Sequence, residues 1–278
     1  MNEIYSIPLL TSLAVGLLAT GAVAGVLAGL LGVGGGIVTV PVLFLLFDFL
    51  DVPPAVAMHL AVGTSLATII PTSISSSRAH FKREAVDVEM LRSWAPLIFA
   101  GALAGGIVSR FVTSGFLTIF FGAVALLVAI NMAIPRKLVV AEALPKGAVG
   151  RGVLPGIIGV FSSLMGIGGG TLSVPILNAF SFPMHKAVGT AAAFGFVIAV
   201  PATAGFIWSG LDVPERPPLS LGYVNIVAAV LIFTTSVLTA PFGSRIAHAL
   251  NPERLKLAFA IFLGLTAIRM LWSALGAG

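Results

Sequence analysis

Ten apolar segments, nearly free of charged residues, follow one another along this chain of 278 residues. A helix that crosses a bilayer needs about 20 apolar residues, and most of the segments approach or exceed that length. They are rich in Ala, Leu, Gly and Val and lack the strict alternation of β-strands. The sequence therefore predicts an all-α polytopic membrane protein, with a single membrane domain over residues 1–278. The ten segments are roughly 8–31, 36–50, 55–76, 94–110, 115–134, 152–166, 170–182, 187–208, 221–243 and 255–274.

Composition supports this class of protein and excludes others. Hydrophobic residues make up 58% of the chain and charged residues 9%, whereas soluble domains average about 45–50% and about 25%. The net charge of +5 comes from scattered basic residues rather than a stripe, which argues against a nucleic-acid partner. The absence of cysteine excludes disulfides and thiolate metal sites. We expect a lipid bilayer around the protein and neither a metal nor a cofactor within it.

The charges between the segments predict an orientation, because cytoplasmic loops carry an excess of Lys and Arg. Loops 77–93, 135–151 and 243–256 are basic and are predicted to be cytoplasmic. Turn 47–54 and loop 209–220 are predicted to lie outside, as are both termini, in a multi-pass protein of the cytoplasmic (inner) membrane. The basic residues of the first two loops are Arg78, Lys82, Arg83 and Arg92, then Arg136, Lys137, Lys146 and Arg151.

Two stretches of sequence occur twice in the same order. LGVGGGIVTVPVL at 31–43 matches MGIGGGTLSVPIL at 165–177 at seven of thirteen positions, and HLAVGTS at 59–65 matches HKAVGTA at 185–191. Shared glycines, a proline and a histidine are harder to obtain by chance than shared Leu or Val. The duplication predicts a first repeat at 8–134 and a second at 152–274, with about five helical elements each and the cytoplasmic linker 135–151 between them.

The loop charges place matching elements of the two repeats on opposite sides of the membrane. This predicts inverted-topology repeats, an arrangement found in many secondary transporters. Segments 36–50, 152–166 and 170–182 are short for full spans, since 15 residues of helix cover only about 22 Å. They are predicted to be broken or short helices at the duplicated glycine motif, either half-helices, re-entrant segments or shortened spans.

The motif GxGGG breaks a helix, because glycine costs about 1 kcal/mol there relative to alanine. The freed backbone groups cannot face lipid. If new helices begin at Gly36 and Gly170, their first N–H groups carry a partial positive charge and suit an anion. The alternative is that these glycines only allow close helix packing, which small residues often do in membranes.

No Lys, Arg, Asp or Glu lies at the centre of a predicted span. An anion at mid-depth would therefore be held by backbone dipoles and hydroxyl groups. The alternatives are that the two motif histidines are boundary residues and that the hydroxyls bond the backbone of their own helix. Prolines within the segments are predicted to kink or break helices, and these are Pro41, Pro71, Pro175 and Pro201. The candidate binding residues are Gly34, Gly35, Gly36, Thr39, His59, Thr64, Ser65, Gly168, Gly169, Gly170, Ser173, His185 and Thr190.

With GVGGGIVTVPVL, HLAVGTS, GIGGGTLSVPIL and HKAVGT, the chain resembles the sulfite exporter TauE/SafE family of membrane proteins over nearly its whole length. The resemblance implies transport, usually export, of sulfite or small organosulfonates. It carries over to the glycines Gly34–Gly36 and Gly168–Gly170, and to Pro41, His59, Thr64, Pro175, His185 and Thr190. The second repeat has Ala191 where the first has Ser65. The two repeats therefore do not offer the same set of hydroxyl groups.

We therefore expect a secondary transporter, most simply an exporter, for a small oxyanion or sulfonate. A transporter or channel for another small solute and an accessory membrane subunit are the alternatives. An enzyme is not expected, because the sequence shows no HExxH motif, no cysteine nucleophile and no mid-span carboxylate. The sequence leaves a homo-oligomer open.

Overall fold

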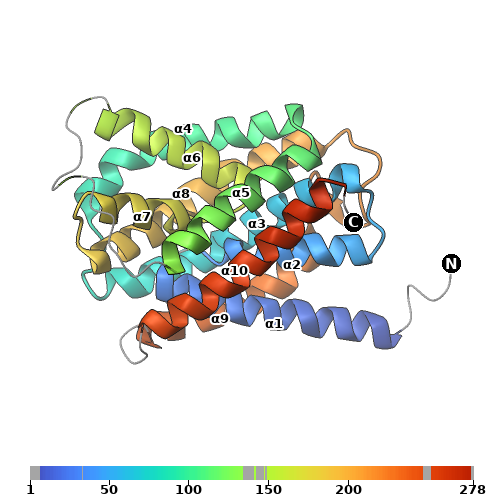
Figure 1. Ribbon diagram of the computed structural model, residues 1–278, viewed down its shortest axis with the longest axis horizontal. Helices are drawn as coiled ribbons and strands as arrows, with labels where there is room; N and C mark the ends of the chain where they lie inside the picture. Colours follow the sequence, from blue (N-terminus) through green and yellow to red (C-terminus); the bar gives the residue numbers. More distant parts are fainter. Residues whose placement is uncertain are drawn as a thin grey trace.

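A computed structural model describes residues 7–32, 34–133, 141, 147, 149–246 and 252–276. Within these residues the chain is almost entirely helical, and its helices run roughly along one common direction (Figure 1). The α-helices are α1 (Ile7–Leu31), α2 (Gly36–Phe49), α3 (Pro54–Phe81), α4 (Val88–Val108), α5 (Ser114–Ala133), α6 (Leu154–Met165), α7 (Gly170–Ala179), α8 (Met184–Gly210), α9 (Ile226–Ile246) and α10 (Pro252–Ala274).

The described helices confirm an all-α polytopic membrane protein. Six of them are long and apolar enough to cross a membrane, namely α1, α3, α4, α5, α8 and α9. The helices α2, α6 and α7 have only 14, 12 and 10 residues. The three segments predicted to be short are therefore short.

Two helices form the core. Of their most apolar windows, 78% is buried for α3 and 72% for α8, against 33–39% for the other candidate spans. These two helices pack against each other, with α9 also against α3 and α4 also against α8. Many large apolar side chains are exposed on the outer helices. Together they form the kind of apolar surface that a bilayer would cover.

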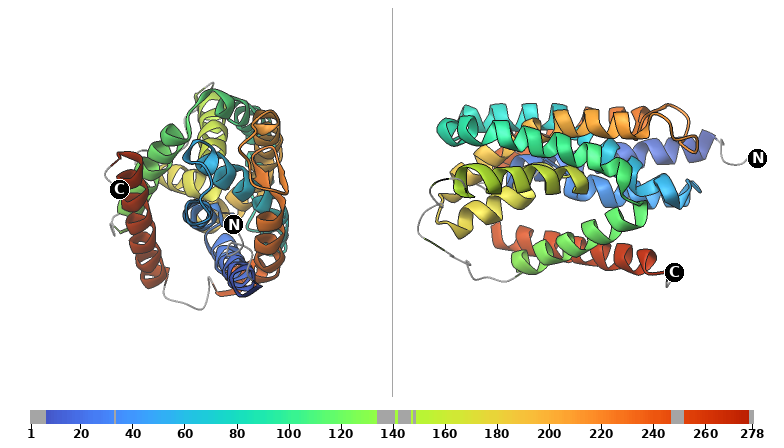
Figure 2. Two further views of the ribbon diagram at one scale, coloured as in Figure 1. Left: turned by 90° about the vertical axis from the view of Figure 1, so that its right-hand side faces the viewer. Right: turned by 90° about the horizontal axis from the view of Figure 1, so that it is seen from above.

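The packing pairs each repeat with the other rather than with itself. Helix α1 lies along α9, and its counterpart α6 lies along α4. The last helices of the two repeats, α5 and α10, pack together on one side of the molecule (Figure 2). The helices of the two predicted repeats therefore pack largely against one another.

Small residues allow the close contact between α1 and α9. A Cβ on Gly21, Gly25 or Gly29 would collide with the backbone or the threonine side chains of α9. The hydroxyls of Thr235 and Thr239 donate to carbonyls of α1 at 2.7 and 2.9 Å. These glycines serve close packing of two helices, as is common in membranes.

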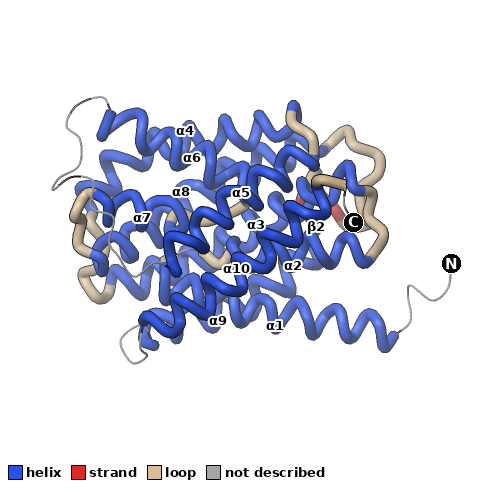
Figure 3. The backbone as a smooth tube through the Cα atoms, in the orientation of Figure 1, coloured by secondary structure: helices blue, strands red, loops and turns tan. Residues whose placement is uncertain are grey.

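Several predicted boundaries need correction. Helix α3 continues to Phe81 instead of ending near 76, because His80 packs against α1 with Nε2 3.1 Å from the Gly29 carbonyl oxygen. The segment predicted as a helix from 221 instead begins with a two-stranded hairpin, β1 (Ser220–Leu221) and β2 (Val224–Asn225), at one end of the molecule (Figure 3). Most of the predicted linker 135–151 lies outside the described residues.

The four prolines predicted to kink or break helices lie inside continuous helices. Pro41 is in α2, Pro71 in α3, Pro175 in α7 and Pro201 in α8. The real interruptions are at the glycine motifs, where α1 ends before α2 and α6 ends before α7. Pro41 and Pro175 therefore follow the breaks and do not cause them, and α3 and α8 continue past Pro71 and Pro201.

Candidate functional site at the two glycine breaks

The two glycine motifs meet inside the molecule. A Cβ on Gly34 would lie 3.1 Å from the Cα of Gly168, and a Cβ on Gly36 would overlap the Gly166 carbonyl oxygen. Gly34–Gly36 and Gly168–Gly170 are all buried. The breaks are in direct contact, as the prediction of a shared site required.

The contact lies near mid-depth of the core helices. The side chain of Ile69 lies 3.2 Å from the Cβ position of Gly34, and Ile69 is the sixteenth of the 28 residues of α3. Gly195, the twelfth of the 27 residues of α8, lies beside Gly169. Helices α2 and α7 thus both begin in the interior, where their first N–H groups have no intrahelical partner.

At the first break the nearby hydroxyl groups are engaged. Thr39 donates to the Gly35 carbonyl at 3.2 Å, one turn back in α2. Ser65, on α3, donates to the Gly166 carbonyl at 2.7 Å and so fixes the end of α6. A hydroxyl has one proton, and in these two residues a carbonyl already accepts it.

At the second break hydroxyl groups remain without a partner. Ser173 is the counterpart of Thr39, yet its Oγ has no hydrogen bond and is fully buried. Ser73 on α3 is also buried and unpartnered, and it borders the Cβ position of Gly195 on α8, as the backbone nitrogen of Gly169 does. The other buried side-chain atoms without a partner in the described residues are His59 Nδ1, Ser162 Oγ, Thr171 Oγ1 and Thr203 Oγ1.

Thr64 and Thr190, both predicted to bind substrate, each accept a hydrogen bond from a backbone N–H of the other repeat. Thr64 accepts a hydrogen bond from the Asn225 N–H at 2.9 Å, where α9 begins. Thr190 accepts one from the Asp87 N–H at 2.9 Å, where α4 begins. Each threonine therefore anchors the start of the fourth helix of the other repeat.

The two motif histidines lie at opposite ends of the core. His59 is buried, with Nε2 3.0 Å from the Ser109 carbonyl oxygen and its ring stacked on Tyr223 at 4.6 Å. Burial raises the pKa of the Tyr223 phenol, although Arg110 opposes the shift. His185 is exposed at the start of α8. The structure does not bring either histidine to the glycine breaks.

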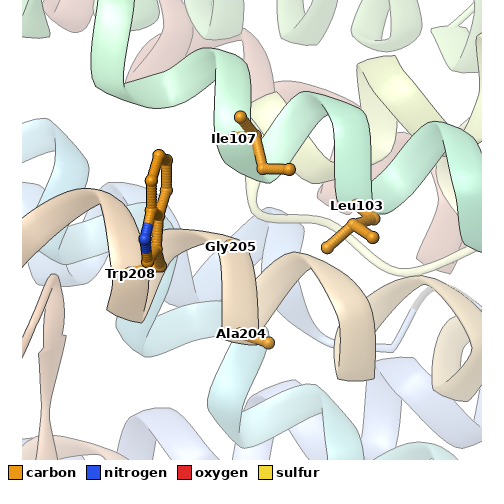
Figure 4. A pocket seen from close by; sticks show the side chains of 5 residues that line it. All are labelled: Leu103, Ile107, Ala204, Gly205 and Trp208. Atoms are coloured by element: carbon orange, nitrogen blue, oxygen red, sulfur yellow. The ribbon is translucent and has the colours of Figure 1, made fainter.

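A pocket elsewhere in the described chain is apolar. A hollow of about 280 Å³ between α4 and α8 is lined by Leu103, Ile107, Ala204, Gly205 and Trp208, all close together in Figure 4. Its lining is apolar, which does not suit an anion. Among the described residues no group of three or more His, Asp or Glu could hold a metal ion.

These features define a class of protein, a multi-pass helical membrane protein with two discontinuous helices that begin in its interior. The family described as "Sulfite exporter TauE/SafE" matches residues 17–270. The chain belongs to the TauE/SafE family.

Curated relatives are similar over nearly their whole length. A probable membrane transporter protein of Haemophilus influenzae is 36% identical over 256 residues, covering 91% of this chain and 96% of the relative. One of Methanocaldococcus jannaschii is 29% identical, covering 92% and 94%. A third, YunE of Bacillus subtilis, is 29% identical, covering 84% and 87%. No solved structure matches significantly. The family and these relatives identify a membrane transporter.

Proposed function

We propose that this protein is a secondary transporter that exports sulfite or a small organosulfonate across the cytoplasmic membrane. The observation that carries the proposal is the contact between the two breaks, Gly34 against Gly168, near mid-depth. Two helices begin there, and each helix N-terminus is equivalent to about half a positive charge. An anion that has lost its hydration can be held there by donors already fixed in place.

The proposal includes alternating access by two inverted repeats. It is supported by the directions of counterpart helices, since α3 and α8 run in opposite directions, as do α1 and α6 (Figure 1). The breaks are closed off by buried residues on α3 and α8. Rocking of one repeat against the other would expose the breaks to one side at a time.

Transport by the purified protein tests this function. Proteoliposomes loaded with radiolabelled sulfite or methanesulfonate should release label faster with the protein than without it, and unlabelled sulfite outside should exchange with it. Phosphate and chloride serve as control anions. Release of neither sulfur anion above protein-free liposomes would contradict the proposal, and transport of a different solute alone would reassign the substrate.

A further inference from the structure

The two breaks differ in what surrounds the start of the new helix. At the first break Ile69 fills the space, with its Cγ2 3.2 Å from the Cβ position of Gly34 and its Cδ1 2.9 Å from that of Gly36. Extending the HLAVGTS and HKAVGTA match without a gap pairs Ile69 with Gly195. The second break therefore has a glycine where the first has a branched apolar side chain.

The space beside Gly195 brings polar groups together. The position of a Cβ on Gly195 lies 2.5 Å from Ser73 Oγ and 3.8 Å from the backbone nitrogen of Gly169. Ser73 is 1% exposed and has no hydrogen-bond partner. Its hydroxyl and the N-cap residue of α7, a helix of ten residues, thus both border the space beside Gly195.

A second hydroxyl without a partner, that of Ser173, lies near the N-terminus of α7. Ser173 lies one turn after Gly169, on the same face of α7, and helix side chains lean toward the N-terminus. Its Oγ is fully buried and has no partner. A buried hydroxyl without a partner costs about 1–3 kcal/mol, so two such groups at one helix N-terminus require an explanation.

We propose that the anion binds on one side of the paired breaks, at the N-terminus of α7, where the Gly169 N–H and the hydroxyls of Ser73 and Ser173 donate to its oxygens. The first break holds no substrate: the Thr39 hydroxyl is bonded to the Gly35 carbonyl, and Ile69 covers the start of α2. Because Ser73 comes from the first repeat and Ser173 from the second, motion between repeats assembles or opens the site. This inference rests on the proposed function and adds the position of its site.

The matched pair Ser173→Ala and Thr39→Val tests the inference. Sulfite binding to the full chain in detergent is measured by calorimetry. Ser173→Ala and Ser73→Ala should each weaken sulfite binding at least tenfold, about 1.4 kcal/mol. Neither variant loses a hydrogen bond of the structure. Thr39→Val should change affinity less than about twofold, because the Gly35 carbonyl keeps the N–H groups of Val38 and Thr39 as donors.

A third variant adds a methyl group without removing a donor. In Gly195→Ala the new Cβ would displace only the Ser73 hydroxyl, which can rotate, so the protein should melt as before and bind sulfite at least tenfold more weakly. Equal losses in Thr39→Val and Ser173→Ala would overturn the one-sided site and favour a symmetric one. Unchanged affinity in Ser73→Ala and Ser173→Ala would place the site elsewhere. If the unaltered protein neither binds nor transports sulfite or methanesulfonate, the proposed function fails and the inference with it.

Discussion

The two glycine breaks have nearly the same sequence and different backbones. At the first, Gly32, Gly34 and Gly35 all have positive φ angles, between 67° and 79°. At the second, Gly166 has φ 65° while Gly169 has φ −58°, an ordinary helical value. The glycines of the first break are therefore required by conformation, whereas Gly169 is required by space, since its Cβ would lie 2.5 Å from the Ala191 carbonyl oxygen.

This difference shows that two copies of a motif can keep the same architecture while their side chains take different roles. Both copies start a helix in the interior, which is the shared task. The first copy bonds its hydroxyls to carbonyls, as Thr39 shows, and the second leaves Ser173 free. An alanine at Gly35 would combine a left-handed backbone with a Cβ 2.8 Å from the Ala24 carbonyl oxygen. Such a variant would report on folding rather than on binding.

The comparison of the two breaks assumes that the two repeats have opposite orientations in the membrane. Cysteine labelling tests this orientation with an all-or-none result. Lys82 follows α3 and Glu215 follows its counterpart α8, and both are exposed. The chain lacks cysteine, so single cysteines can be introduced at these two positions. In intact cells an impermeant thiol reagent should label Glu215→Cys and leave Lys82→Cys unlabelled until the membrane is opened, as the basic loops predict.

Labelling of Lys82→Cys alone would reverse the orientation and leave the inversion intact. Labelling of both cysteines in sealed cells would contradict the inverted repeats. A cysteine at buried Ser65 serves as the control for reagent that enters the protein interior.

Stability distinguishes the two serines of α3 that approach the breaks. Ser65→Ala leaves the buried Gly166 carbonyl without its side-chain donor and should cost about 1–3 kcal/mol, which is several degrees of melting temperature in a chain of this size. Ser73→Ala removes a hydroxyl that has no partner and should not lower the melting temperature. Thermal unfolding in detergent, followed by tryptophan fluorescence, measures both.

Equal losses of melting temperature in Ser65→Ala and Ser73→Ala would contradict the predicted difference between these two serines. Ser65→Thr, which keeps the hydroxyl, is the matched control, and its oxygen should preserve most of the stability that Ser65→Ala loses. A stabilised Ser73→Ala protein would strengthen the view that this serine is kept for binding at the expense of folding.

Much of the fold follows from local sequence, because apolar length and glycine breaks are local properties. The three short helices were predicted from length alone, and the family from the duplicated motifs. The hairpin at 220–225 was missed, because its two residues per strand carry no alternating pattern and Asn225 is held by Thr64 from far along the chain. Helix α3 was ended too early for the same kind of reason: His80 gains its partner only from α1.

The candidate site was predicted less completely than the fold. The glycines were found because they break a periodic pattern. Ser73 and Gly195 were missed, since Ser73 is one of several hydroxyls on α3 and Gly195 one of many glycines in the chain. Comparing the two repeats beyond the motif would have exposed Gly195 as the exception opposite Ile69. The sequence also does not show that Thr64 and Thr190 each hold a helix start, because their partners Asn225 and Asp87 are far along the chain.

The smallest expected effect concerns pH. Neither break contains an ionisable side chain, and no Asp or Glu lies at the centre of a spanning helix, so we expect no carboxylate relay of the kind that many pumps use. Methanesulfonate stays fully ionised from about pH 6 to 8, and its flux should vary less than about twofold over this range, also in the double variant His59→Gln/His185→Gln. Sulfite takes up a proton near neutral pH, and its flux should change with pH in both proteins alike.

A steep pH dependence of methanesulfonate flux that the double variant abolishes would assign a proton-linked role to these histidines. If the double variant kept this pH dependence, a titratable group at one of the two glycine breaks would be indicated. The two breaks would then differ in charge as well as in hydrogen bonding.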